Sequence, residues 1–553
     1  MFITKNDQNY SESNSLDTII NPASSDNIEE LISELNFLVN QEISTKSIKL
    51  VTNRLAAAIV SNCTSSSELR LHLVNMIKIN RINKIILKLT TTVNTYVIDN
   101  TQSTCDNIIM SVDELINNYQ IDNMDIVILA ISNCLESIID DICDMSKSHN
   151  TRIDVIKSLC TPLTKLAMSE MTIDVIITKL MINLAKTINL FEKNGYVTTS
   201  NVVCCIIETL LSNINSTNAQ KILFKIMNTL NHIIEYSPKI YGSTLRIIES
   251  LSVALNHDIL AKNNISVSDD VLTLISQKIT NELIENLQII VTNFIKHGGG
   301  TTSEAVCCIV DALVSNIDST NVDKILLTIM DQLKQVIKKS RKIYGTSFSV
   351  IESLSGALHA NLSVDGNLST EISENIIDKL IFCLDKIIDT FIKHGGGTTS
   401  GAVCCIINTL ASNINTSNIE RILFVMTYRL KQVINSSPNI FGTTLEIIKA
   451  FAAVLENRSL IDNNFSIKLN DAIVGDLIMC LHTTIDKFIE SHYSTAYTAI
   501  KCIVRSILNR NNESNFDRIY IAFVLYLDKI INNIAPHDDI IQIFTDAIKV
   551  VSS

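Results

Sequence analysis

Apolar residues recur along most of the chain at the spacing of one helix face. After residue 268, for example, Leu272, Ile275, Ile279 and Leu283 follow one another at intervals of three or four residues. In an α-helix this spacing gathers apolar side chains on one side. The alternation of apolar and polar residues that indicates a strand is scarce. The pattern therefore predicts an all-α protein built from amphipathic helices.

A unit of about a hundred residues recurs within the chain. The octapeptide KHGGGTTS occupies residues 296–303 and 393–400, and a variant, KNGYVTTS, occupies residues 193–200. A pair of adjacent cysteines follows each of these segments: Cys204-Cys205, Cys307-Cys308 and Cys404-Cys405. The segment AIKCIVRSIL, which contains Cys502, takes the same place in a fourth copy. These matches predict four tandem copies of one unit.

Each copy carries the pattern of four helices. The cysteine pair lies in the second helix, and a polar loop such as VSNIDSTN leads to a third, KILLTIMDQLKQVI. A turn such as SRKIYGTS then precedes a fourth helix, FSVIESLSGAL. We place the copies at residues 171–267, 268–370, 371–467 and 468–553.

The two ends of the chain differ from this pattern. Residues 1–25 are predicted to be a disordered tail. Residues 26–170 are predicted to be degenerate helical repeats, because IDVIKSLC at 153–160 matches LRIIESLS at 245–252. In the last copy the second helix carries the basic residues Lys501, Arg505 and Arg510. We interpret this copy as a polar C-terminal cap, which repeat arrays need for solubility.

Two architectures fit four helices per unit. One is a continuous α-solenoid of helical hairpins, two hairpins per unit, like a HEAT-type array. The other is a string of separate four-helix bundles. The polar segments that join the units, such as HANLSVDGNLST, are short enough to let neighbouring units pack together. We therefore favour the solenoid.

Composition narrows the class of protein and its surroundings. Hydrophobic residues make up 46% of the 553 residues, which excludes a disordered chain. The formal net charge of −12 disfavours attraction to nucleic acid. Apolar runs stay shorter than the ~18 to 20 residues of a membrane helix, so we expect no membrane partner. The polar N-terminal segment has no signal-peptide core, so a cytoplasmic location is expected, with a secreted or virion-associated protein as the alternative.

The glycine-rich loops are the candidate binding site. Free N–H groups at a helix N-terminus can hold an anion, and a basic pair of residues precedes each loop. The loops match neither GxxxxGK[ST] nor its strand context. The structural alternative is a flexible turn that ends in N-cap residues, Thr301 to Ser303 here and Ser319 to Asn321 before the third helix. The candidate residues are Lys296, His297, Gly298, Gly299, Gly300 and Thr301, and Lys393, His394, Gly395, Gly396, Gly397 and Thr398.

Other chemistry-bearing residues favour structural roles. The adjacent cysteines stand in apolar helices, where reduced cysteine packs as a small hydrophobe. They lack the CxxC-like spacing and converging histidines of a metal site. Histidine has no serine or cysteine partner at the spacing of a catalytic triad. We therefore expect no metal, no cofactor and no enzymatic activity. A basic run comprises Lys334, Lys338, Lys339, Arg341 and Lys342. Such a run can bind an acidic partner, but a solvated helix end near the negative end of the helix dipole explains it, and we favour that interpretation.

The unit pattern resembles the helical domains of spider silk proteins. The segments SVIESLSGALHANLSVDGNLS and TTSGAVCCIINTLASNINTSNIERIL carry the resemblance. Both families of sequence join amphipathic helices through turns rich in Ser and Asn. The resemblance implies a secreted, self-assembling structural protein. The chain departs from silk proteins in its cysteine pairs and in its lack of Ala-rich or Gly-rich tracts.

Together these patterns predict a non-catalytic scaffold or protein-binding surface. The glycine-rich loops would recur at regular intervals and engage an elongated protein partner. The first alternative is a structural protein that associates with itself in a virion, sheath or silk-like fibre. The second is an enzyme that uses the glycine-rich loops on a phosphate compound.

Overall fold

The computed structural model describes the greater part of the chain. The described residues are 54, 66–99, 101–118, 124–144, 150–165, 169–256, 259, 268–362, 370–415, 417–456, 467–533 and 538–552. The predicted tail at 1–25 lies outside them. Within these residues the secondary structure is helical and contains no strand. The all-α prediction is confirmed.

The chain divides into two compact units. The first comprises Met1–Ser137 and Leu166–Ser169. It contains α3 (Ser66–Asp99), α4 (Gln102–Asn118) and most of α5 (Met124–Asp144). α3 and α4 pack on each other through buried apolar side chains, among them Leu89, Val93, Ile108 and Leu115.

The second unit comprises Ile138–Lys165 and Glu170–Ser553. Each of the four predicted copies contributes four helices to it. The helices are α6 (Asn150–Lys165), α7 (Glu170–Asn194), α8 (Val197–Ser212), α9 (Ala219–Tyr236), α10 (Gly242–Ala254), α12 (Asp269–His297), α13 (Gly300–Ser315), α14 (Val322–Lys339), α15 (Gly345–Leu362), α16 (Thr370–His394), α17 (Gly397–Ser412), α18 (Ile419–Ser436), α19 (Gly442–Leu455), α20 (Ile467–Ser491), α21 (Ser494–Leu508), α22 (Phe516–Asn533) and α23 (Asp538–Ser552).

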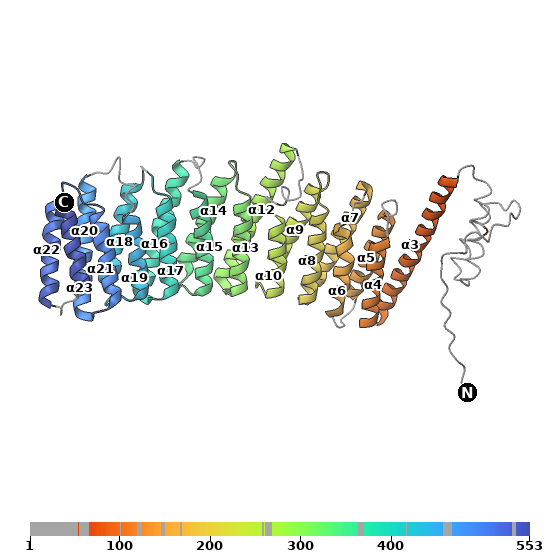
Figure 1. Cartoon of the computed structure of the whole chain (residues 1–553), viewed down its shortest axis with the longest axis horizontal. Coiled ribbons are helices and arrows are strands. Elements are labelled where there is room, and N and C mark those ends of the chain that lie inside the picture. Colours follow the sequence, from red (N-terminus) through yellow and green to blue (C-terminus); the bar gives the residue numbers. More distant parts are fainter. Residues whose placement is uncertain are drawn as a thin grey trace, which may run out of the picture. The chain divides into compact units, whose positions relative to one another are not determined.

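The helices of the second unit form two layers. Successive contacts define one layer as α7, α9, α12, α14, α16, α18, α20 and α22. The other layer is α6, α8, α10, α13, α15, α17, α19, α21 and α23. Figure 1 shows these helices side by side, from the yellow α7 to the blue α23. Within a copy, the first and second helices form one hairpin across the layers, and the third and fourth helices form another. The loop between the second and third helices joins the two hairpins.

The copies join without a break. α10 packs on α13, α15 on α17 and α19 on α21, across the predicted borders between copies. These helix pairs pack as extensively as the pairs within a copy, such as α13 with α15. The second unit is therefore a continuous α-solenoid with two hairpins per copy, and the alternative of separate bundles is wrong.

The helix α6 extends the array before the first copy. It packs against α8 as α10 packs against α13. Its buried side chains Val155, Ile156 and Leu159 match Ile247, Ile248 and Leu251 of α10, which are also fully buried. The match between 153–160 and 245–252 therefore reflects an equivalent place in the fold.

The core lies between the two layers and follows the sequence periodicity. In α14 the buried residues include Ile325, Leu326, Ile329, Met330 and Leu333, which share one face. Burying a side chain of this size contributes about 1.5–3 kcal/mol to stability. Some polar side chains are buried as well, such as Thr209 and Thr484, whose hydroxyls donate to carbonyls of their own helices.

Candidate binding surface

The hairpin loops of the second unit lie along one edge, here called the hairpin edge. It consists of residues 195–196, 237–241, 298–299, 340–344, 395–396, 437–441 and 492–493. The loops between hairpins lie at the opposite edge, here called the junction edge. The junction edge includes residues 213–218, 316–321 and 509–515. All predicted site residues lie at or beside the hairpin edge.

The glycine-rich segments are tight turns that only glycine adopts without strain. Gly298 has φ +67° and ends α12, and its N–H donates to the carbonyl of Phe294 at 2.7 Å. Gly299 follows with φ +105° and precedes α13. Gly395 and Gly396 repeat this geometry with φ +64° and +101°. Positive φ disfavours side chains with a Cβ atom, so the conformation explains both glycine pairs.

The first and last copies share only the first position of this turn with positive φ, and they contain one glycine or none. Gly195 and His492 occupy the position of Gly298 and have φ +65° and +57°. Tyr196 and Tyr493 stand where Gly299 stands, each with an extended backbone at φ −72°. The second glycine is therefore specific to the two middle copies, and an aromatic residue replaces it in the outer ones.

The prediction that Thr301 to Ser303 cap the second helix is wrong. α13 already begins at Gly300, and its N-cap residue Gly299 has no side chain to donate or accept. The Thr301 hydroxyl instead donates to the carbonyl of Ile240 in the preceding copy. Thr398 donates to Ile343 in the same way, at 2.6 Å. The repeated threonine therefore ties consecutive copies together.

The prediction that Ser319 to Asn321 supply the N-cap residue of the third helix is right about the position. Asn321 stands at the N-cap position of α14 but makes no side-chain capping bond. Its Oδ1 accepts from the N–H of Asp318 at 2.8 Å, and its Nδ2 donates to the carbonyl of Asn316 at 2.8 Å. The Asp318 carboxylate in turn accepts from the N–H of Thr320 at 2.7 Å. The side chains close the loop on itself, as Asx-turns do.

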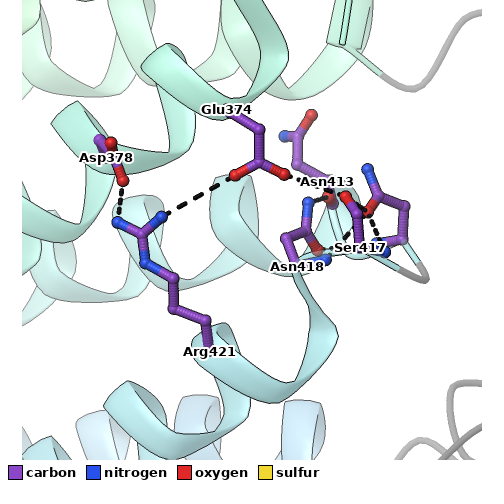
Figure 2. A network of polar contacts seen from close by, with 7 residues as sticks. Glu374, Asp378, Asn413, Ser417, Asn418 and Arg421 are labelled. Carbon is purple, nitrogen blue, oxygen red and sulfur yellow. Dashed lines mark hydrogen bonds and ion pairs between the residues drawn. The ribbon is translucent and has the colours of Figure 1, made fainter. Parts of the chain in front are cut away.

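The junction edge uses its polar groups internally. Figure 2 shows the loop of the third copy, where Asn418 donates to the carbonyl of Asn413 at 3.0 Å. Ser417 donates to Glu374 of α16 at 2.9 Å, and Arg421 pairs with Glu374 and Asp378. The polar groups of the loop and of the helix thus serve as hydrogen-bond partners for one another. This explains the recurring segments SNINSTN, SNIDSTN and SNINTSN as a structural motif.

In the first two copies the asparagine at the end of the second helix also donates to the helix pair before it. Asn316 Nδ2 donates to the carbonyl of Leu255 at 2.9 Å, and Asn213 Nδ2 donates to Leu163 at 2.8 Å. In the last copy Arg510 Nε takes this role and donates to Leu455 at 3.1 Å. Arg510 is buried, so it is not part of a polar outer face. The interpretation of the last copy as a cap stays a prediction.

Exposed aromatic residues mark the hairpin edge. Each directly precedes a helix of the second layer, and between 45% and 66% of its surface is exposed. The five residues are Tyr196, Tyr241, Tyr344, Phe441 and Tyr493. The rings of Phe441 and Tyr493, from neighbouring copies, lie 5.9 Å apart. Sequence reasoning missed this series, although the aromatic residue before Gly recurs in YGST, YGTS and FGTT.

Basic residues accompany the aromatic series in the middle copies. Lys296, His297, Lys393 and His394 are exposed at the ends of α12 and α16. The run Lys338, Lys339, Arg341 and Lys342 is exposed at the end of α14 and in the loop after it. Lys334 of the same predicted run lies elsewhere, 5.0 Å from the ring of Phe382. The hairpin edge of the middle copies is therefore basic on a chain of net charge −12.

A shallow pocket interrupts this edge in the first copy. Its volume is about 450 Å³. The loops after α7 and α9 form its walls, and His297 of the next copy closes one side. Lys239 and Tyr241 contribute a cation and an aromatic ring to its lining. It offers room for one side chain of a partner.

The cysteine pairs serve packing. The first cysteine of each pair contacts its own copy, as in Cys307, whose Sγ lies 3.9 Å from the carbonyl oxygen of Ser349. Burial raises the pKa of Cys308, its neighbour, to about 12, and the pKa of Cys205 to about 11. These thiols are free and are kept protonated, which is unlike a reactive cysteine.

Metal binding and membrane insertion find no support in the described residues. Among them, no group of three His, Cys, Asp or Glu side chains is placed to hold a metal ion. None of the described helices combines the length and the apolar character needed to span a bilayer.

The comparisons with known proteins show helical repeats and nothing more specific. No protein-family model matches the sequence, and no curated protein is similar to it. A circular tandem repeat protein aligns over 95% of this chain and 94% of its own, with 9% identity and a TM-score of 0.22. A structure from work on a phosphorylation switch between cadherin and beta-catenin aligns over 95% and 90%, with 10% identity and a TM-score of 0.33. A SYS-1/POP-1 complex covers 84% of this chain and 93% of its own, with 11% identity and a TM-score of 0.26.

With TM-scores of 0.22 to 0.33, these structures say nothing about the function of this chain. The α-solenoid follows from the helix packing of the chain itself. The resemblance to silk domains stays a prediction.

Proposed function

We propose that the chain is a non-catalytic scaffold that binds an elongated, acidic segment of another protein along its hairpin edge. The series of five exposed aromatic residues, with a basic cluster among them, carries the proposal. Aromatic side chains offer a large contact area and lose little conformational entropy on binding. Basic side chains attract an acidic partner and set its register.

The repeat geometry favours an elongated partner. Tyr241, Tyr344 and Phe441 stand at equivalent positions of the first three copies, and Tyr196 and Tyr493 share a second position in the first and last copies. Packed helices lie about 8–10 Å apart, so aromatic groups recur along the edge at intervals of one or two helices. A folded, compact partner would meet only part of such a series. An extended segment with alternating acidic and apolar residues meets several aromatic and basic groups at once.

The polar groups elsewhere support this choice of surface. The junction edge closes on itself through Asn316, Asp318 and Asn321. The hydroxyls of Thr301 and Thr398 are donated to carbonyls of the preceding copies. Among the loop residues, the exposed aromatic and basic side chains of the hairpin edge are therefore the ones available to bind a partner.

Random peptides displayed on phage and selected on the immobilised chain test the proposal. We expect the selected peptides to be enriched in acidic and apolar residues. Reversing charge with Lys338→Glu and Lys342→Glu is expected to weaken their binding at least about tenfold. The matched control reverses the charge of two exposed residues on the second layer, Lys449→Glu and Lys501→Glu, and is expected to bind normally. Peptides without an acidic bias, or equal losses in both variants, would contradict the proposal.

A further inference from the structure

Exposed apolar side chains gather on the outer face of three consecutive helices of the first layer, α18, α20 and α22. Between 48% and 60% of each side chain is exposed. The five residues are Phe424, Tyr428, Met479, Ile521 and Leu525, here called the α18–α22 patch. For α18 and α20, which have neighbours on both sides and the other layer behind them, the outer face is the one open to solvent.

Contacts between the three helices place these residues at one level. Lys431 Nζ of α18 lies 2.8 Å from Asp476 Oδ1 of α20, and Tyr526 Oη of α22 donates to the carbonyl of Ile478 at 3.1 Å. Tyr428, Met479 and Leu525 each lie within one helical turn of these contacts. Phe424 and Ile521 lie one turn earlier on their own helices. The patch is therefore continuous across all three helices.

The patch is specific to the last two copies. Phe424 and Tyr428 of α18 correspond in the repeat to Ile521 and Leu525 of α22. The position of Tyr428 is Asn228 in the first copy and Asp331 in the second. Phe224, the first-copy counterpart of Phe424, is covered by Lys278, whose Nζ lies 4.4 Å from the ring centroid. At these two positions the third helix of each copy thus changes from polar or covered in the first copy to open and apolar in the last two.

The charges beside the patch are matched with one another. Lys431 pairs with Asp476, and Lys529 pairs with Asp486. Both ion pairs are satisfied within the chain, so these charges do not select a charged partner, in contrast to the basic hairpin edge. An apolar surface is complementary to a second copy of itself, and homodimer interfaces are more apolar than other interfaces.

The size of the patch suits a stable dimer. Tyr520, Val524 and Ile531 continue the apolar surface onto the adjoining flank of α22, with 39%, 40% and 54% of their surfaces exposed. Eight large side chains that are each about half exposed offer an area of the order of the ~800 Å² that one partner buries in a standard interface.

We propose that two copies of this chain associate through their α18–α22 patches around a twofold axis. The same residues then face each other in both copies, so the contact closes at two chains. The association leaves both hairpin edges free, because the patch lies on the outer face of the first layer. The dimer is thus independent of the proposed peptide binding.

Light scattering coupled to size-exclusion chromatography of the full chain, loaded at about 1 µM to about 100 µM, tests the proposal. We expect the mass to rise to twice the chain mass of 61.4 kDa and to stop there. The double variant Ile521→Glu with Leu525→Glu is expected to weaken dimerisation at least about a hundredfold, since central apolar residues dominate such interfaces. Met171→Glu, at a position 80% exposed on α7 of the same layer, is the matched control and is expected to dimerise normally.

Three outcomes overturn the proposal: a wild-type mass of one chain throughout, a mass that climbs past two chains, or a patch variant that still dimerises. Circular dichroism of the double variant checks that it folds. Binding of the selected acidic peptides is measured on the same variants. If the patch variant is a monomer and still binds peptide, dimerisation and peptide binding use different surfaces. The failure of one proposal can then be distinguished from the failure of the other.

Discussion

The hydroxyl of Thr398 lies 2.6 Å from the carbonyl oxygen of Ile343 and donates to it across the border between two copies. Thr301 with Ile240 and Thr495 with Ile440 form the same link. The accepting carbonyl lies in a loop that stands 55 or 61 residues before the threonine in the sequence. Each link therefore fixes one hairpin turn of the edge against the turn before it.

Thr398→Val is expected to destabilise the second unit by about 1 kcal/mol, because valine keeps the shape of threonine but removes the donor. Urea denaturation followed by circular dichroism measures the loss. Thr328→Val is the control, since that hydroxyl donates only to Lys324 within its own helix. An equal loss in the two variants would mean that the link between copies contributes nothing of its own.

Alanine substitutions at the two ends of the glycine turn are expected to change the stability of the fold in different ways. Gly395→Ala is expected to lose about 1–2 kcal/mol, because φ +64° strains a residue with a Cβ atom. Gly397→Ala is expected to be neutral or to gain about 0.4–1 kcal/mol, because this residue begins α17 and no atom lies within 4 Å of an added Cβ. Thermal melts of both variants measure these changes in stability. A loss of stability in Gly397→Ala would contradict the turn geometry.

The sequence predicted the helices and their number per copy because amphipathic periodicity is a local property. It also located the glycine turns. It misassigned Thr301, because the acceptor at Ile240 lies 61 residues earlier and local sequence favoured a cap. It missed the aromatic series, because exposure of Tyr241 or Tyr344 depends on how the hairpins stack. For the same reason it gave no sign that Leu525 and Met479 share one surface.

His297→Ala combined with His394→Ala is expected to weaken binding of the selected acidic peptides by about threefold to tenfold. Both side chains are exposed beside the glycine turns, so the fold should not change. Fluorescence anisotropy with a labelled selected peptide measures the affinity, and a thermal melt checks the fold. Unchanged affinity in the double variant would remove the histidines from the binding surface.

Alkylation of the buried thiols is expected to be slow and to accelerate with pH. Only the thiolate reacts, and burial raises the pKa of Cys308 and of Cys160 to about 12. Their thiolate fraction therefore rises about tenfold per pH unit between pH 7 and pH 9. Mass spectrometry after timed iodoacetamide treatment, with the urea-unfolded chain as reference, measures the rates per residue. Fast modification of Cys308 at pH 7 would refute a purely structural role.

Inorganic phosphate is expected to leave the melting temperature unchanged relative to chloride at equal ionic strength. At the start of α13 the hydroxyls of Thr301 and Ser303 are already donated, to Ile240 and Gly300, so an oxyanion would have only backbone N–H groups to bind it. A rise in melting temperature that Gly299→Val abolishes would instead favour a phosphate site in the glycine-rich loop.

The threonine links and the Asn316 link between copies run in one direction, and this bears on how such an array grows. In each of these bonds the donor is a side chain of the later copy, Thr301 or Asn316 for example, and the acceptor is a backbone carbonyl of the earlier copy, Ile240 or Leu255. Every residue type provides such a carbonyl, so the earlier copy needs no matching side chain. A gene segment duplicated in tandem would thus encode its own means of attachment, and a new copy could join the array before any compensating mutation arose.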